Sequence, residues 1–227
     1  MKPRLALIAV CGAFIAAALA GCGGSGSDNG VASKSPAEIV TAASDAINHA
    51  SSVHVAGSIV SSGTPVSLDL NLVSGKGGRG QMSESGLIFR VVAVGQTVYI
   101  QGTPAFWQHN GGAAAARVLS GRWLKAPATG QFSSLAQLTN MQQLMTTLLT
   151  SHGTLSKAGV TTLRGHQVVA VSDKTRGGTL YIATTGHPYP IEIRKQGSSG
   201  GQIAFDRFNQ QVSLIAPAHA IDISQLG

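Results

Sequence analysis

The feature that most constrains the fold is a change of hydrophobic period near residue 53. Before it, apolar residues recur every three or four positions, as on one face of a helix. After it, apolar and polar residues alternate, which places the apolar ones on a single face of a strand. The alternation is cleanest in the run Val66, Leu68, Leu70 and Leu72. A sheet with one apolar face needs helices to cover that face.

Two segments have the pattern of covering helices. Ser35-Pro36-Ala37-Glu38 has the residues of a capping box, with proline at the first helical position, and predicts a helix over 35–50. Apolar residues at helical spacing predict a second, continuous helix over 132–149. An alanine-rich helical turn is expected near 113–119, and Phe106 and Trp107 are placed in the loop before it.

The rest of the chain consists of short alternating runs separated by glycine-rich and proline-containing turns, and the last run is near 212–214. This order predicts an α+β fold with about ten antiparallel strands and two main helices. So many consecutive strands form a strongly twisted sheet that tends to curl. Because only two helices cover its concave face, we expect a candidate apolar cavity between sheet and helices.

The N-terminus has the composition of a secretory signal over residues 1–21. Lys2 and Arg4 precede an apolar run that ends in Leu19-Ala20-Gly21-Cys22. This tetrad resembles the lipobox of bacterial lipoproteins, which implies a diacylglyceryl group on Cys22 that anchors the chain to a cell membrane outside the cytoplasm. An ordinary cleaved signal and a short membrane anchor are the alternatives, although the run is shorter than the roughly 20 residues that span a bilayer.

The residues after Cys22 predict a flexible Gly/Ser tether over 22–34, followed by a single domain over 35–227. The two cysteines are Cys11, inside the signal, and Cys22, so none is left for a disulfide. The formal net charge of +7 is scattered, and no lysine and arginine block with interleaved aromatic residues predicts nucleic-acid binding. A weak preference for an anionic lipid surface and a merely solvated exterior are both compatible with this charge.

No motif predicts catalysis, a cofactor or a metal, so we expect a protein that is not an enzyme. The Gly-x-Gly-x-x-Gly match at 75–80 is followed by a strand pattern rather than a helix, and the Gly-x-Ser-x-Gly match at 197–201 lies between two predicted strands. The seven histidines are dispersed, with His49 and His54 the nearest pair, and the carboxylates are scattered.

The chain resembles the LolA-like class of envelope lipoproteins and lipoprotein carriers, including the LppX/LprG type. The resemblance rests on the lipobox, the capped helix, the strand opening at 52–57, the segments 98–100, 106–107 and 121–123, the late hairpins within 178–193, and the segments 203–208 and 212–217 that follow them. It implies a half-barrel sheet wrapped around helices, with lipids, acylated glycolipids or lipoprotein acyl chains bound between them. Carriers of this class lack an anchor, whereas this chain is predicted to have one. The resemblance therefore favours short-range handover or sensing at the membrane over long-range transport.

The predicted cavity has one wall on each layer. Its residues are Leu68, Leu70 and Leu72 on the sheet, Leu138, Met141, Met145 and Leu149 on the second helix, and Phe106 and Trp107 at the entrance. Plain core packing is the alternative for the helix, and a loop anchored on the sheet is the alternative for the aromatic pair. The first hypothesis is therefore an anchored lipid-binding protein. The other is an interaction or regulatory module with a filled core that binds an envelope protein.

Overall fold

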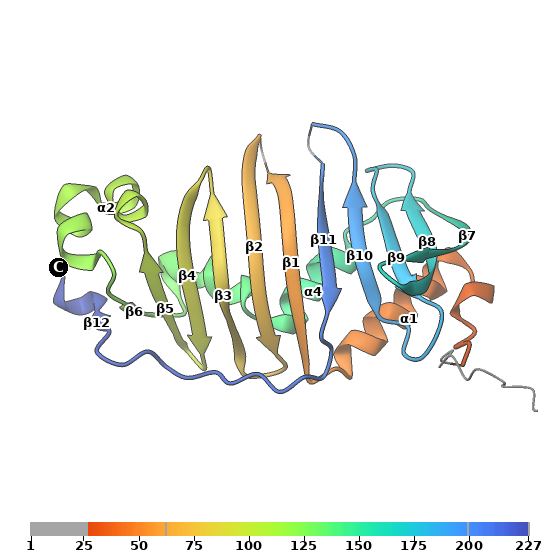
Figure 1. Ribbon diagram of the computed structural model, residues 1–227, viewed down its shortest axis with the longest axis horizontal. Helices are drawn as coiled ribbons and strands as arrows, with labels where there is room; N and C mark the ends of the chain where they lie inside the picture. Colours follow the sequence, from red (N-terminus) through yellow and green to blue (C-terminus); the bar gives the residue numbers. More distant parts are fainter. Residues whose placement is uncertain (1–26, 62, 199, 227) are drawn as a thin grey trace, which may run out of the picture.

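The computed structural model describes residues 27–61, 63–198 and 200–226. The predicted signal and Cys22 lie outside the described residues. One twelve-stranded sheet runs the length of the molecule in the order β12-β6-β5-β4-β3-β2-β1-β11-β10-β9-β8-β7 (Figure 1). The strands are β1 Ser52–Ser61, β2 Thr64–Val73, β3 Gly77–Glu84, β4 Leu87–Val94, β5 Thr97–Gly102, β6 Leu124–Pro127, β7 Leu155–Leu163, β8 His166–Asp173, β9 Thr179–Ala183, β10 Pro190–Lys195, β11 Gly201–Asp206 and β12 Ile221–Asp222. The predicted α+β class and curved open sheet are confirmed.

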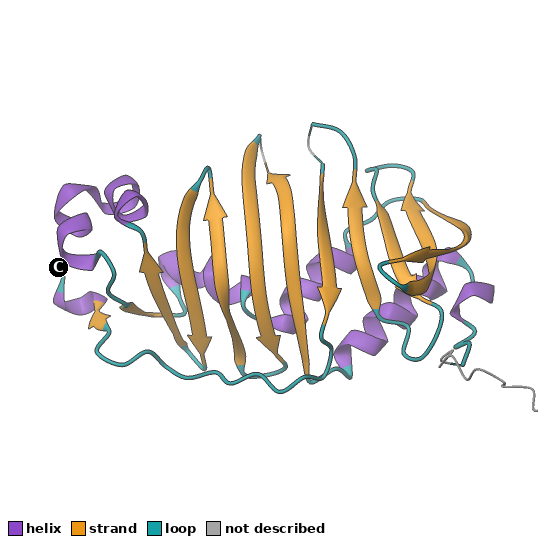
Figure 2. Cartoon of the chain, viewed as in Figure 1, coloured by secondary structure: helices purple, strands orange, loops and turns teal. Residues whose placement is uncertain are grey.

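Helices α1 (Pro36–Asn48), α3 (Ser133–Leu138) and α4 (Met141–Thr150) cover one face of the sheet, which we call the inner face (Figure 2). The capping box is confirmed: the Ser35 side chain accepts a hydrogen bond from the Glu38 N–H, and the Glu38 carboxylate accepts one from the Ser35 N–H at 2.9 Å. Among the described residues, no helix has the length and apolar character needed to cross a membrane.

The predicted helix over 132–149 is divided in two, which corrects the sequence interpretation. After α3, the side chain of Asn140 accepts a hydrogen bond from the Gln143 N–H at 3.0 Å and caps α4. The apolar spacing runs through the break and therefore hides it. Below the break lies Gly78 of β3, where an added Cβ would come within 3.1 Å of the Thr139 carbonyl oxygen. A residue without a side chain thus lets the α3–α4 junction approach the sheet.

Phe106 and Trp107 lie in a helix, not in the predicted loop. Helix α2 (Pro104–Leu119) begins at Pro104, and the Thr103 hydroxyl accepts a hydrogen bond from the Phe106 N–H at 3.3 Å. Gly112, with φ of 72°, kinks α2 and separates its aromatic half from its alanine-rich half. The sequence interpretation recognised only the second half, because it overlooked the cap that Thr103 and Pro104 provide.

Two segments near the ends of the predicted domain also differ from expectation. Val31 is 1% exposed, and the Asn29 side-chain amide donates to the Ala183 carbonyl at 3.0 Å, so the folded part begins before Ser35. Near the C-terminus, the segment 212–214 is not a strand. The chain instead runs along the ends of the strands (Figure 1), and β12 pairs in parallel with β6. Both glycine motifs lie at hairpins, as expected: 75–80 begins in the β2–β3 turn and continues into β3, and 197–201 begins in the β10–β11 connection and ends at the first residue of β11.

Glu192 is a charged side chain that is completely buried near the β7 end of the sheet. Its carboxylate lies 2.8 Å from Nε of Arg164 and 2.6 Å from Nη2 of Arg194. Arg164 comes from the β7–β8 turn, which therefore reaches over the outer face of β10. The ion pairs compensate the desolvation of a carboxylate that is 0% exposed.

Substitution of Glu192 by alanine should lower the free energy of unfolding by about 2–3 kcal/mol. Breaking a buried ion pair costs roughly 3–5 kcal/mol when the remaining charge stays buried. The loss here should be smaller, because Arg164 and Arg194 are 47% and 39% exposed and can be hydrated. Lys125→Met, which breaks the exposed pair with Asp222, should cost less than about 1 kcal/mol. Urea unfolding checks both, and equal losses would show that Glu192 has no special structural role.

The close approach of β3 to β2 at Gly80 leads to a second prediction. A Cβ at Gly80 of β3 would lie 2.0 Å from the Asp69 carbonyl oxygen, whereas a Cβ at Gly159 of β7 meets nothing within 4 Å. Gly80→Ala should therefore destabilise the protein by about 1–3 kcal/mol, and Gly159→Ala should be neutral or stabilise it by a few tenths. Thermal unfolding of the two variants compares them directly, and an unchanged Gly80→Ala melting temperature would contradict the prediction.

Candidate functional site

Most of the predicted cavity residues are packed in the core. Leu70, Leu72 and Met141 are 0% exposed, and Met145 and Leu149 are 1% and 3% exposed. They belong to one continuous buried cluster, together with Leu68 and residues of α1. The structure therefore brings the two predicted walls together, and their side chains fill most of the space between them.

A small inner cavity remains between the helices and the β7–β10 end of the sheet. Its volume is about 90 Å³, compared with the roughly 300–1,000 Å³ typical of ligand sites. The apolar part of its lining is Val40, Leu148, Leu149, Leu155, Val171, Leu180 and Ile193. Leu149 is the predicted cavity residue that lines it.

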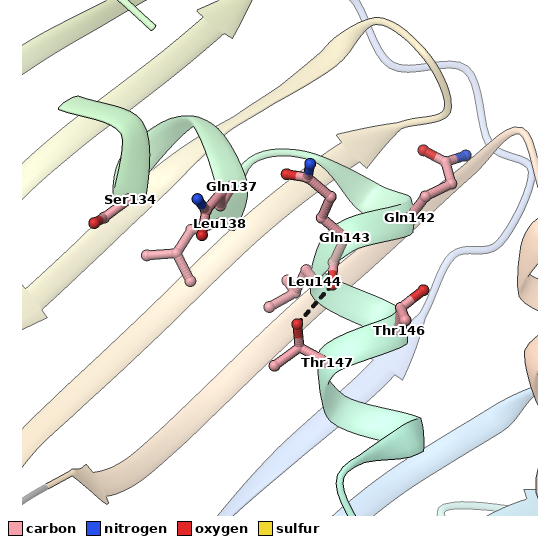
Figure 3. A pocket seen from close by; sticks show the side chains of 8 residues that line it. All are labelled: Ser134, Gln137, Leu138, Gln142, Gln143, Leu144, Thr146 and Thr147. Carbon is pink, nitrogen blue, oxygen red and sulfur yellow. Dashed lines mark hydrogen bonds between the residues drawn. The ribbon is translucent and has the colours of Figure 1, made fainter. Parts of the chain in front are cut away.

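A larger concavity, the α3–α4 groove, lies in the angle between these two helices (Figure 3). Its volume is about 650 Å³. Leu138 and Leu144 supply its apolar surface, and its other side chains are polar but uncharged: Ser134, Gln137, Gln142, Gln143, Thr146 and Thr147. Leu138 is the predicted residue found here. The break at Asn140 creates the groove, and the sequence interpretation missed both.

The predicted entrance residues lie elsewhere. Phe106 packs with its ring centroid 4.8 Å from that of Phe89 on β4, and Trp107 is 6% exposed. Neither lines the inner cavity or the α3–α4 groove. Phe106 instead lines a separate, mostly polar groove of about 490 Å³ beside Leu87. The aromatic pair therefore anchors α2 on the sheet, away from the predicted cavity walls.

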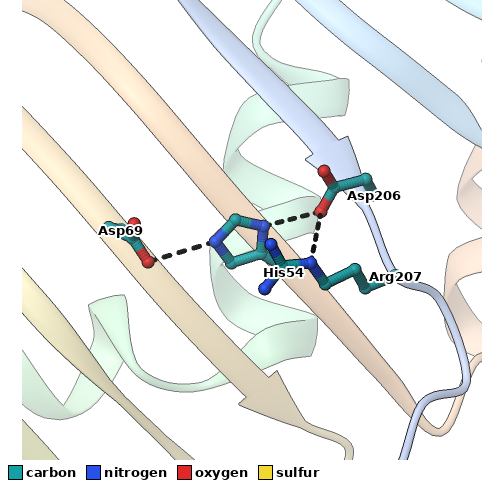
Figure 4. A network of polar contacts seen from close by, with 4 residues as sticks. All are labelled: His54, Asp69, Asp206 and Arg207. Carbon is teal, nitrogen blue, oxygen red and sulfur yellow. Dashed lines mark hydrogen bonds and ion pairs between the residues drawn. The ribbon is translucent and has the colours of Figure 1, made fainter.

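On the outer face, His54 bridges two carboxylates (Figure 4). Its Nδ1 lies 2.6 Å from Asp206 on β11, and its Nε2 lies 3.1 Å from Asp69 on β2. The bridge joins β2, β1 and β11 above the centre of the sheet. Sequence spacing could not reveal it, because strand register brings Asp206 beside His54. Within the described residues, no three His, Cys, Asp or Glu side chains are arranged to hold a metal.

Asp173 fixes the rim of the inner cavity. Its carboxylate accepts backbone hydrogen bonds from Gly153, Thr175 and Arg176 at 2.8, 2.8 and 2.9 Å. These bonds to Arg176 and Gly153 hold the pKa of Asp173 below its ordinary value of 3.8. The segment that leaves α4 is thereby tied to the β8–β9 turn.

Asp173→Asn should accelerate amide hydrogen exchange at Gly153, Thr175 and Arg176. An amide oxygen accepts more weakly than a carboxylate. Because the folded-state pKa is depressed, the carboxylate stabilises the fold above its unfolded pKa, and this contribution is lost as the pH falls through the lower folded value. The difference between wild type and variant should therefore disappear in strong acid. Equal exchange at neutral pH would contradict the assigned role.

Comparison with solved structures places this architecture among known folds. LprF from Mycobacterium bovis matches with a TM-score of 0.57 and 14% identity, covering 81% of this chain and 97% of that one. The Mycobacterium tuberculosis lipoprotein LppX matches with a TM-score of 0.53 and 17% identity, covering 79% and 98%. No protein-family model and no curated protein sequence matches the chain. The predicted resemblance is thus confirmed at the level of structure: the chain has the LolA-like fold of LppX/LprG-type lipoproteins.

Proposed function

We propose that this protein is a bacterial envelope lipoprotein, anchored through a diacylglyceryl group on Cys22, that binds a lipid or other amphiphile on the helices that cover the inner face of its sheet. In this proposal it hands the ligand over within the envelope and performs no covalent chemistry. The observation that carries the proposal is the α3–α4 groove, whose 650 Å³ is within the range of ligand sites. The fold that this chain shares with the lipoprotein LppX supports it.

The groove lining indicates what kind of amphiphile fits. Its side chains carry no charge, and its glutamines, serine and threonines offer hydrogen-bond donors and acceptors. An apolar chain lying on Leu138 and Leu144 would gain about 25 cal/mol for each Å² of apolar surface removed from water. A ligand with a neutral, hydroxyl-rich headgroup is therefore favoured over one with a charged headgroup.

The second candidate is an envelope interaction module with a filled core. The tight burial of Leu70 and Leu72 favours it, because these side chains are 0% exposed and packed into the core between sheet and helices. In this case the α3–α4 groove binds a segment of a partner protein rather than a lipid.

Lipid binding can be tested with a fluorescent neutral diacylglycerol and native mass spectrometry of protein purified from its own host. Leu138→Glu should weaken binding by about tenfold or more, because a carboxylate against an apolar chain is costly to desolvate. Val118→Glu is the matched control, since Val118 is 43% exposed on α2, away from the groove.

Binding that both variants retain would place the lipid elsewhere. The absence of any lipid adduct, together with capture of a defined protein that Leu138→Glu abolishes, would favour the interaction module.

A further inference from the structure

The outer face of the sheet carries a second concavity, which we call the outer groove. It lies over β2–β4 and beside the residue that precedes β6, and its volume is about 480 Å³. The polar and aromatic side chains that line it are Asp69, Asn71, Arg79, Gln81, Arg90 and Trp123. No helix covers this part of the described sheet (Figure 2).

Strand register places two arginines of the outer groove next to each other. Arg79 is opposite Val92, and Arg90 is two residues before Val92 on the same strand. Arg79 and Arg90 are therefore diagonal neighbours on one face, a relation in which residues are roughly 7–8 Å apart. Both are exposed, and their long side chains can reach a single group between them.

Neither arginine forms an ion pair with an acidic side chain of the described residues. The acid of the groove, Asp69, contacts Nε2 of His54 at 3.1 Å, and Arg90 contacts the amide oxygen of Gln101 at 3.5 Å. Arg164 and Arg194 near the other end of the sheet differ, because both form ion pairs with Glu192.

We propose that the outer groove binds the phosphate group of a phosphate ester. Two guanidinium groups that approach one oxyanion from different strands match the geometry of phosphate, which each can bind through paired N–H donors. The amides of Asn71 and Gln81 add neutral donors, and the partly buried Trp123 offers an aromatic surface to the rest of the ligand. A bound anion would also relieve the repulsion between the two like charges.

This site is independent of the α3–α4 groove, because the two concavities lie on opposite faces of the sheet. The phosphate ester has two possible sources, a soluble metabolite and a lipid headgroup, and the experiment separates them. All described elements lie within residues 27–226, so the test uses the chain from residue 22 with Cys22→Ser, which carries no acyl group.

The first measurement is the affinity for inorganic phosphate and glycerol phosphate by calorimetry at low salt. The second is co-sedimentation with phosphatidylcholine vesicles that do or do not contain phosphatidic acid. Arg79→Gln and Arg90→Gln should each weaken binding by about tenfold to a hundredfold, and Arg79→Lys by less, because lysine keeps the charge without the paired donors. Arg117→Gln on α2 removes the same charge elsewhere and should change nothing.

Binding of the soluble anions identifies a soluble ester as a sufficient ligand, and binding only to vesicles with phosphatidic acid identifies a lipid headgroup. Either result supports the proposal if the Arg79 and Arg90 variants lose this binding and still unfold at the wild-type temperature or above. No binding of any probe, or binding that Arg117→Gln weakens equally, would overturn it. Loss of diacylglycerol binding in Leu138→Glu tests the inner face separately.

Discussion

The antiparallel pairing of β1 with β11 is the contact on which the rest of the sheet depends. It joins a series of strands from the first half of the chain, β1 to β6, to a series from the second half, β7 to β11. Both series consist largely of hairpins between neighbours in sequence, whereas the register pair His54 and Asp206 is 152 residues apart. Closing so long a loop is entropically costly and slows folding. The bridge from Asp69 through His54 to Asp206 holds this junction together on the outer face.

Joining the two series creates a single sheet with two unlike faces. The inner face is apolar and is covered by α1, α3 and α4, so its chemistry is that of a core with a groove at the α3–α4 angle. The outer face is polar, and its charges differ from one end to the other. Near β7 the arginines surround Glu192, while over β3 and β4 Arg79 and Arg90 have no acidic partner among the described residues. An uncovered sheet face can thus carry a binding function that leaves the core unchanged.

Local signals in the sequence predicted most of this architecture. The alternation at 66–73 identified β2 and its buried leucines, and the residues of 35–38 identified the start of α1, because each pattern has a direct local cause. Features that depend on strand register were not predictable: Asp206 beside His54, Arg90 beside Arg79, and Glu192 between two arginines. The cap at Asn140 was overlooked because a strong apolar period continued through it, and the α3–α4 groove was missed with it.

The predicted cavity illustrates a second limit of prediction from sequence. An apolar strand face has the same sequence pattern whether it is packed or hollow, so Leu70, Leu72, Met141 and Met145 could be assigned to the inner face but not to a cavity wall. In the structure they belong to one buried cluster; a cavity of about 90 Å³ lies beside Leu149, and a more polar one of about 380 Å³ lies beside Met141 at the ends of the strands. Deeper entry of a ligand would require α4 to move away from the sheet. Helix α4 has only ten residues, begins at the Asn140 cap and ends beside the segment that Asp173 ties to the β8–β9 turn. Methionine side chains can repack around a new shape at little cost. The cap at Asn140 and the hydrogen bond from Gly153 to Asp173 hold the two ends of this region in place and would oppose such a movement.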